Sequence, residues 1–279
     1  NLDGSTVDIL KITPRLRQSV NGTSIKYDSV EFSAIPDADV IEYKVGVEEL
    51  YEFKRNIQFV PTIKTVNVDR KRHYVTPTNN TYPSITTVLS TRHKEGLFEW
   101  RKRVGEDVAN YIARTSANRG SVVHKICEDY LCNKHIYSPE EFRMHEVKTF
   151  LPYCLFNQLR KRALHNIDNI YAQETALWSD ELMVAGRVDC IADYEGTPSV
   201  IDFKTARSER NDDWNLNYYT QATAYCQMFE ERTGIEINQV VILVVTEDGS
   251  VQEFVKDKKD YQKELEEALN EFHHNRLAS

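Results

Sequence analysis

Residues 186–205, GRVDCIADYEGTPSVIDFKT, restrict the fold more than any other part of this 279-residue chain. Two runs that alternate apolar and polar residues surround the turn-forming residues EGT, and this pattern predicts a β-hairpin. With Gly196 and Thr197 at the tip of the hairpin, Asp189 faces Lys204 across the two strands.

One face of this predicted hairpin carries three charged side chains. Asp189, Asp202 and Lys204 point to the same side, because side chains on a strand alternate with a period of two. In this register Asp202 lies opposite Ile191, so the two carboxylates are diagonal neighbours, roughly 7–8 Å apart, and can reach one ion. Buried like charges repel each other unless a cation is present, so the hairpin predicts a site for a hard divalent metal such as Mg²⁺ or Mn²⁺. The alternative is an ordinary hairpin in which Asp189 and Lys204 form a cross-strand ion pair.

The composition indicates a globular protein with reduced thiols. Hydrophobic residues make up 41% of the chain and charged residues 28%, which excludes a wholly disordered or collagen-like protein. The longest apolar run is VVILVV at 240–245, far short of the roughly 20 residues that span a bilayer. The five cysteines are odd in number and form no CxxC pair, which argues against a disulfide framework, a zinc ribbon and an iron–sulfur cluster.

Charge is distributed unevenly along the chain, although the net charge is −8. Residues 81–170 carry 14 basic and 10 acidic side chains, whereas residues 171–279 carry 10 basic and 22 acidic ones. A basic region beside a carboxylate-rich one suits an enzyme that grips phosphates in one place and binds a divalent metal in another. Ordinary solvated helix faces explain the same counts about as well.

The sequence divides into three parts. Residues 1–58 contain short alternating runs broken by turn residues, which predicts a small strand-rich segment of unassigned role. Residues 59–83 resemble a connection that carries one or two strands, and residues 84–279 form the main domain.

The main domain begins with helical patterns and continues with strands. Apolar residues recur at helical spacing on both sides of Gly105, a predicted helix break, and again after Gly120. A third helical stretch is predicted at 139–167, and a fourth, at 215–232, lies between the hairpin and the apolar strand 238–245. These patterns predict an α/β domain.

Three weaker signals surround the hairpin, and each has an ordinary structural explanation. His124 and Glu128 lie four residues apart and share one helix face, where a histidine is usually a core residue. Glu174 lies in the strand before the hairpin and can be an exposed strand residue. The helix after the hairpin carries a stripe that packing alone can explain, formed by Tyr218, Gln221 and Tyr225.

In chain order these residues resemble the motif series of the RecB-like branch of the PD-(D/E)xK nuclease superfamily. The series reads G-x-x-x-H-x-x-x-E, E, G-x-x-D, D-x-K and Y-x-x-Q-x-x-x-Y, and the matching residues are Gly120, His124, Glu128, Glu174, Gly186, Asp189, Asp202, Lys204, Tyr218, Gln221 and Tyr225. Segments such as YPSITTVL and RGSVVHKICEDYL are similar to a group of mitochondrial and phage-encoded exonucleases, over about residues 82–255. The D-x-K element alone is unspecific, but the ordered set seldom agrees by chance. The nominal Pro-Asp of the superfamily is Val188-Asp189 here, which keeps the ligand.

The resemblance implies a restriction-endonuclease-like core, in which helices flank a mixed central sheet, preceded by the small strand-rich segment. It implies a metal-dependent DNA exonuclease that hydrolyses phosphodiester bonds at single-stranded DNA ends, in DNA replication, recombination or repair. Two alternatives stay open: a structure-specific endonuclease or resolvase with the same metal site, and a non-catalytic DNA-binding protein on a nuclease fold. We expect DNA as the partner, no membrane, and a location in the cytoplasm, or in the host-cell cytoplasm if the protein is phage-encoded, with a mitochondrial location left open.

The resemblance also assigns roles to residues. The implied cofactor is Mg²⁺, which Mn²⁺ can replace, without an iron–sulfur cluster. The expected metal ligands are His124, Glu174, Asp189, Asp202 and the main-chain carbonyl of Phe203. The expected catalytic residues are Asp189, Asp202, Lys204, Gln221 and Tyr225. Candidates for phosphate contact are Arg101, Lys102, Arg103, Arg119 and Lys125. Trp100 or Tyr111 can stack on bases, although their apolar spacing favours packing in the core.

Overall fold

A computed structural model describes residues 52–92, 95–134 and 147–277, and four short strands nearer the N-terminus. The chain forms two compact units, Asn1–Leu50 and Tyr51–Ser279. The described residues of the first unit form two antiparallel strand pairs: β1 (Ile12–Pro14) with β4 (Val30–Phe32), and β2 (Arg17–Gln18) with β3 (Ile25–Lys26). The strand-rich character predicted for the N-terminal segment is therefore confirmed.

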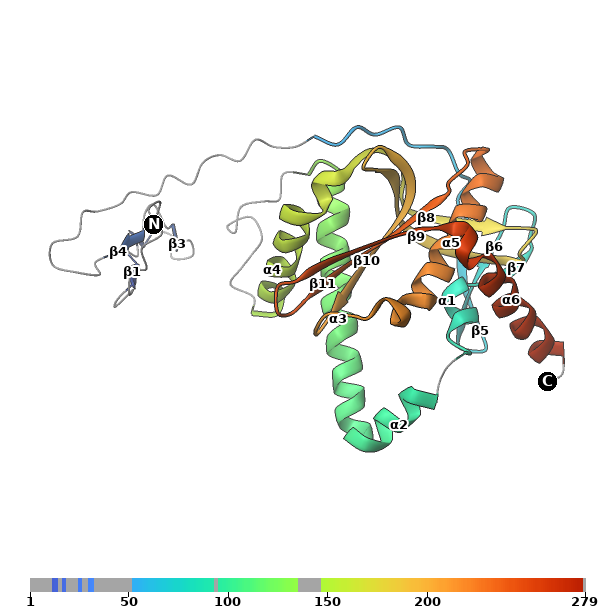
Figure 1. The fold of residues 1–279 in the computed structure, drawn as a ribbon, viewed down its shortest axis with the longest axis horizontal. Helices are drawn as coiled ribbons and strands as arrows, with labels where there is room; N and C mark the ends of the chain where they lie inside the picture. Colours follow the sequence, from blue (N-terminus) through green and yellow to red (C-terminus); the bar gives the residue numbers. More distant parts are fainter. Residues whose placement is uncertain are drawn as a thin grey trace. The chain divides into compact units, whose positions relative to one another are not determined.

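The second unit is built on a five-stranded mixed sheet (Figure 1). Its strands lie in the order β12, β11, β10, β9, β8, with bounds Val251–Asp257, Gln239–Thr246, Thr197–Ala206, Val184–Tyr194 and Ile167–Ser179. Only the β10–β11 pair of this sheet is parallel. The predicted α/β fold with a mixed central sheet is confirmed.

Helices cover both faces of this sheet (Figure 1). One face packs against α1 (Ile85–Leu89), α5 (Leu216–Thr233) and α6 (Gln262–Leu277). The other face packs against α3 (Glu106–Leu131) and α4 (Val147–Arg162). Short 3₁₀ turns complete the unit at Leu164–Asn166, Asp212–Asn215 and Lys258–Tyr261. Among the described residues, no helix combines the length and the apolar character that a membrane span requires.

Strand β11 shows why the sheet has two cores. Its apolar run alternates between the faces, so that Val240 and Ile242 join the core under α5 while Val241 and Leu243 join the core under α3 and α4. A strand that is covered on both sides needs apolar residues at every position, which explains the unbroken run VVILVV.

The central hairpin forms with a register that differs from the predicted one. Thr197 pairs with Tyr194, so the tip consists of Glu195 and Gly196, with φ values of 51° and 78°. Two consecutive residues with positive φ make the tight turn that matches the twist of the two strands. The predicted tip at Gly196 and Thr197 is therefore wrong, and Val200, not Asp202, pairs with Ile191.

This correction moves the charged residues relative to one another. The observed ladder between β9 and β10 ends at the Ile201–Cys190 pair, so Asp202 and Lys204 lie beyond it and Lys204 does not pair with Asp189. The partners shift by two positions, which preserves the strand period, so the predicted sharing of faces along β10 survives the correction.

The second unit starts earlier than predicted. Residues 54–58 run along the edge of β8, where the Asn56 amide donates to the Ile170 carbonyl and the Gln58 amide donates to the Tyr171 carbonyl, both at 2.8 Å. Phe53 is 3% exposed and packs in the core of this unit. The predicted boundary after residue 58 is therefore wrong.

Residues 59–83 also belong to this unit rather than to a simple connection. They form a three-stranded sheet of β5 (Lys64–Val68), β6 (Lys71–Val75) and β7 (Thr81–Pro83). A parallel bridge between Ser84 and Ala185 joins the end of this sheet to β9. The predicted start of the main domain at residue 84 is corrected accordingly.

The burial of Phe53 leads to a first prediction. Phe53→Ala is expected to lower the free energy of unfolding of the second unit by about 3–5 kcal/mol, because it opens a cavity in a closed core. Chemical denaturation followed by circular dichroism measures this change. The matched control is Phe59→Ala, since Phe59 is 86% exposed. Equal stability of the two variants would show that residues 51–58 contribute nothing to the unit, and that a chain shortened to residue 60 is intact.

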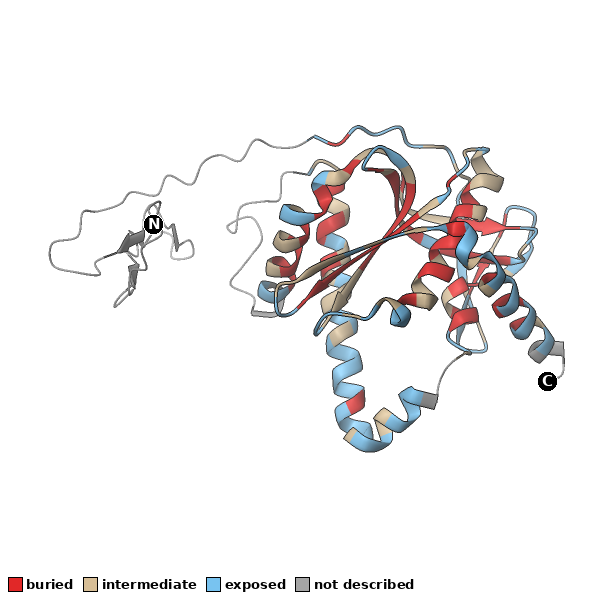
Figure 2. Ribbon diagram, viewed as in Figure 1, coloured by how far each residue is buried: buried red, intermediate tan, exposed pale blue. Residues whose placement is uncertain are grey.

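Helix α2 (Glu95–Val104) and the first part of α3 extend away from the sheet (Figure 1). Gly105 separates the two helices with a φ of 88°, which confirms the predicted break. Both helices are largely exposed here (Figure 2), and Tyr111 is 60% exposed. The core packing favoured for Tyr111 is therefore wrong, because nothing in the described part of the chain covers this side of α3. Of the helix predicted at 139–167, the structure gives α4, and residues 135–146 lie outside the described residues.

Candidate active site

His124 connects helix α3 to the central hairpin. Its neighbours Ile126 and Cys127 pack in the core, which holds this part of α3 against the sheet. The Nδ1 atom of His124 lies 3.3 Å from Oδ2 of Asp189, and its Nε2 atom lies 2.6 Å from the main-chain oxygen of Phe203. The histidine is thus placed by two strands of the hairpin rather than by apolar core packing alone.

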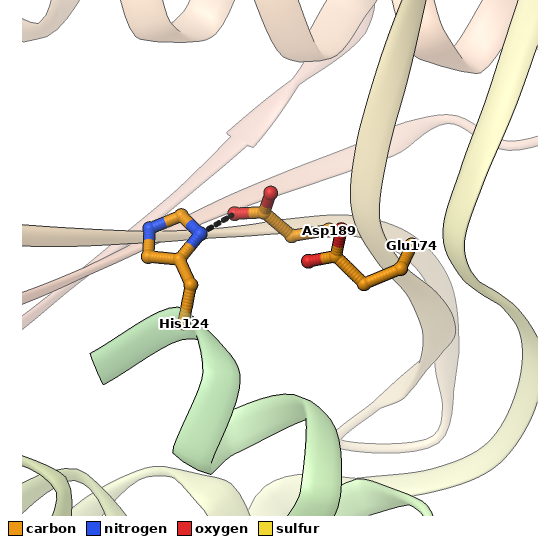
Figure 3. Close-up of side chains that lie close together, drawn as sticks. All are labelled: His124, Glu174 and Asp189. Carbon is orange, nitrogen blue, oxygen red and sulfur yellow. Dashed lines mark ion pairs between the residues drawn. The ribbon is translucent and has the colours of Figure 1, made fainter. Parts of the chain in front are cut away.

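Glu174 completes a group of three possible metal ligands with His124 and Asp189 (Figure 3). One ligand atom from each residue lies within 4.8 Å of the others. Glu174 has a φ of 47°, which interrupts the β8–β9 ladder between the Gln173–Cys190 and Thr175–Val188 pairs. A non-glycine residue in this left-handed region is uncommon, and strained backbone of this kind clusters at active sites and ligand-binding positions.

Asp202 and Lys204 form a buried ion pair next to this group. The Asp202 side chain is 4% exposed and that of Lys204 18%. Asp189 also accepts a hydrogen bond of 3.0 Å from the Phe203 amide, which ties the carboxylate of β9 to β10. Asp202 lies outside the group of three ligand atoms, so the structure brings Asp189 together with His124 and Glu174 more closely than with Asp202.

Charges in the site shift the pKa values of its members. Burial lowers the pKa of His124, but the Asp189 carboxylate outweighs burial and raises the pKa of His124 to about 9. Burial, followed by the charge of Asp189, raises the pKa of Glu174. Burial also raises the pKa of Asp202, against the opposing charge of Lys204, whose own pKa is raised by Asp202 and Asp189 despite burial.

The donor set fits a divalent cation. Glu174 and Asp189 belong to the ligand group and Asp202 lies beside it, and burial, which disfavours a charged carboxylate, raises the pKa values of Glu174 and Asp202. Carboxylate oxygens are the preferred ligands of Mg²⁺, and Mn²⁺ also accepts an imidazole nitrogen. A bound cation would stabilise the ionised form of these buried carboxylates.

The sequence model of the PD-(D/E)XK nuclease superfamily matches residues 92–278. This match covers most of the chain and includes His124, Glu174 and the hairpin that carries Asp189, Asp202 and Lys204. The chain belongs to the PD-(D/E)XK nuclease superfamily. The predicted resemblance is confirmed at this level.

The relatives of this nuclease include exonucleases. Mitochondrial genome maintenance exonuclease 1 of Mus musculus is 29% identical over 141 residues, which are 47% of this chain and 39% of the mouse protein. The protein of the same name from Homo sapiens is 27% identical over 139 residues, which are 47% of this chain and 38% of the human protein. The chain thus aligns with less than half the length of either relative. A solved structure from Eubacterium rectale, described as a proposed exonuclease, gives a TM-score of 0.41 at 15% identity, over 59% of this chain and 65% of that one.

The stripe of Tyr218, Gln221 and Tyr225 on α5 of this nuclease packs beside the site. The Gln221 side-chain amide donates a 3.1 Å hydrogen bond to the Tyr225 hydroxyl, and Tyr225 is buried. A Cβ atom at Gly186 would lie 2.6 Å from Cε1 of Tyr225. Glycine is required at position 186 because the tyrosine ring occupies the space of any side chain there.

The five basic residues predicted to contact phosphate fall into two groups. Arg101 pairs with Glu106, Arg119 pairs with Glu247, and Lys125 pairs with Glu128 and Asp129 at 2.8 and 3.2 Å. Lys102 and Arg103 are exposed on α2. The second group is therefore better placed to meet DNA than the first, whose charges are offset by neighbouring carboxylates.

Two side chains at the site had no assigned role: Tyr218, which belongs to the motif series, and Arg187, which sequence reasoning did not name. The centre of the Tyr218 ring lies near two cations, 4.9 Å from Nζ of Lys204 and 5.2 Å from the guanidinium carbon of Arg210. Arg187 follows Gly186 in the motif, and its Nε atom lies 2.8 Å from Oε2 of Glu174. The alternation of strand residues could have placed Arg187 near β8, but nothing in the sequence shows that Glu174 turns to meet it.

Proposed function

We propose that this chain is a metal-dependent deoxyribonuclease that hydrolyses phosphodiester bonds at single-stranded DNA ends, in DNA replication, recombination or repair. The observation that carries the proposal is the buried pair of Asp202 and Lys204 beside the group formed by His124, Glu174 and Asp189. A protein that only binds DNA has no need for a buried lysine among three carboxylates, since burying charges is costly.

His124, Glu174, Asp189 and Asp202 are the proposed ligands of Mg²⁺ or Mn²⁺. When bound, the ion supplies a Lewis acid that stabilises charge on the phosphoryl oxygens and lowers the pKa of a water. The Phe203 carbonyl, the remaining proposed ligand, accepts a hydrogen bond from His124. It can serve as a ligand only when that contact is released.

Lys204 is the residue proposed to orient the water that attacks phosphorus. Hydrolysis joins a water oxygen to phosphorus and breaks one P–O bond of the backbone, so negative charge develops on the phosphoryl oxygens and on the departing oxygen. The raised pKa of Lys204 keeps its ammonium group protonated beside Asp202, so it would orient the water and offset this charge rather than remove a proton. Gln221, held by Tyr225, would position the DNA backbone beside this lysine.

The projecting helices α2 and α3 are the proposed contact with single-stranded DNA. They expose two aromatic rings, Phe98 and Tyr111, together with the cations Lys102 and Arg103. Stacking platforms interleaved with basic side chains suit a single strand, because every base offers a ring face and every phosphate a charge. The family assignment supports DNA as the substrate, and the two named relatives are exonucleases.

The test uses end-labelled linear single-stranded DNA, linear duplex DNA and circular single-stranded DNA, each with Mg²⁺, with Mn²⁺ and with a chelator. We expect loss of linear single strands with either metal, survival of circles, and no cleavage in the chelator. Cleavage of circles would support the endonuclease or resolvase alternative. Binding of linear strands without any cleavage would support the non-catalytic alternative.

A further inference from the structure

Arg187 holds the one acidic residue of the site whose backbone is irregular. Its Nε group lies 3.1 Å from the main-chain oxygen of Glu174 and 2.8 Å from Oε2 of the same residue. The guanidinium therefore grips Glu174 at both its backbone and its side chain. The Arg187 side chain is 55% exposed, so solvent still reaches about half of it.

The conformation of Glu174 explains why these two contacts with Arg187 are needed. A φ of 47° costs a non-glycine residue on the order of 1–3 kcal/mol and persists only where neighbours hold it. The ladder between β8 and β9 is regular at Gln173 and at Thr175, but it skips Glu174 itself. No ladder pair fixes the backbone at this position, and Arg187 supplies a contact in its place.

We propose that Arg187 is a positioning residue for the metal site. Arg187 binds one carboxylate oxygen and the backbone of Glu174, so that the other carboxylate oxygen of Glu174 faces His124 and Asp189. This inference rests on the proposed metal-dependent function. It adds a residue that neither the motif series nor the ligand group contains. Partners of this kind, which orient a ligand without touching the ion, typically change metal affinity by about 10–100-fold when they are removed.

A rival interpretation gives the opposite sign. If Arg187 only competes with the metal for Glu174, removing its positive charge would strengthen metal binding, because one repulsive cation would be lost. The direction of the change in affinity therefore separates positioning from competition.

The experiment is a calorimetric titration of the whole metal-free chain with Mn²⁺ alone. Arg187→Met removes the charge and both contacts, and Arg187→Lys keeps the charge but cannot reproduce the geometry of the guanidinium. The matched control is Arg72→Met: Arg72 lies on β6, its charge acts on Tyr74 as that of Arg187 does, and its contact is Thr86 rather than Glu174. Melting curves without metal verify that each variant is folded.

We expect Mn²⁺ affinity to fall by about 10–100-fold in Arg187→Met, by a smaller factor in Arg187→Lys, and by less than about twofold in Arg72→Met. Affinity equal to or above that of the parent in Arg187→Met would overturn the proposal. If that variant does not fold, Arg187→Lys decides, and parental affinity in it would overturn the positioning role. A parent that binds no Mn²⁺ would overturn the metal-dependent function as well, which distinguishes the two failures.

Discussion

Replacing Lys204 by alanine lowers the rate of DNA cleavage by about 100- to 1,000-fold, because a preorganised cation is removed from the place where negative charge develops. The same change also lowers the free energy of unfolding. It leaves Asp202, which is 3% exposed, without its ion-pair partner, and a buried carboxylate stripped of its partner typically costs about 3–5 kcal/mol. Single-turnover cleavage of end-labelled single-stranded DNA, well below the melting temperature of the variant, measures the rate.

Lys258 provides the matched control for this experiment. It is also a buried lysine, and it pairs with Glu230 away from the metal-ligand group. Lys258→Ala is expected to lose stability in the same range while it keeps the parental cleavage rate. Similar rates in the two variants would show that Lys204 acts through stability alone, and a Lys204→Ala rate above a tenth of the parental value would reject its role in the reaction.

Elements that depend on local patterns could be predicted from the sequence. The run VVILVV has apolar residues at every position, and only a strand covered on both faces satisfies that pattern in so short a stretch. Gly105 could be predicted as a break because an interruption between two helical patterns is marked by the residue that tolerates a positive φ. The order of motif residues was sufficient to predict the superfamily, because motif order does not depend on register.

The register of the hairpin could not be predicted, because its turn places Glu195 in a backbone conformation that glutamate rarely adopts. Glu195 adopts a φ of 51°, and the sequence gives no reason to place a glutamate in that region rather than Gly196 and Thr197 at the tip. The prediction survived in part because the error was two residues, which is one full strand period. An error of one residue would have turned Asp202 and Lys204 to the opposite face.

Contacts between segments far apart in the chain also could not be predicted from sequence patterns. Phe53 lies 77 positions before Tyr130, yet their rings meet at 5.0 Å between centroids. Conversely, the apolar spacing of α3 favoured packing of Tyr111 in the core, but Tyr111 is 60% exposed. Periodicity shows which residues share a helix face and does not show whether another element covers it.

Replacing Asp202 by asparagine removes most of the stabilisation that the parent gains from Mn²⁺. At a free Mn²⁺ concentration 100 times its Kd, a cation that binds only the folded state adds about 2.7 kcal/mol to the free energy of unfolding. For a unit of this size the corresponding rise in melting temperature is about 5–10 °C. The variant lacks one ligand charge, so we expect less than half of this rise in thermal melts followed by circular dichroism.

Without metal, the Asp202→Asn variant is expected to melt no lower than the parent. The pKa of Asp202 is raised by burial, so the folded carboxyl group binds its proton more tightly than the unfolded one. Binding of that proton stabilises the folded protein fully when the pH is below the pKa that Asp202 has in the unfolded chain. This stabilisation is lost as the pH rises through the pKa that Asp202 has in the folded protein, so at pH 7 the ionised carboxylate opposes folding. Asparagine carries no charge and avoids this cost, and Lys204, whose side chain is 18% exposed, keeps solvent and the charge of Asp189 as neighbours when Asp202 is replaced.

Asp193→Asn is the matched control, because Asp193 lies on β9 and accepts hydrogen bonds from Tyr171 and Asn169 at 2.8 and 3.2 Å rather than joining the ligand group. This variant should keep the full rise with Mn²⁺, whatever its metal-free melting temperature. A full rise in Asp202→Asn would remove Asp202 from the ligands and leave the site to His124, Glu174 and Asp189. If Mn²⁺ does not change the melting temperature of the parent, the charges of the carboxylates are balanced by Lys204 and His124 alone. The hairpin is then an ion-paired structural element, and the proposed nuclease mechanism is wrong.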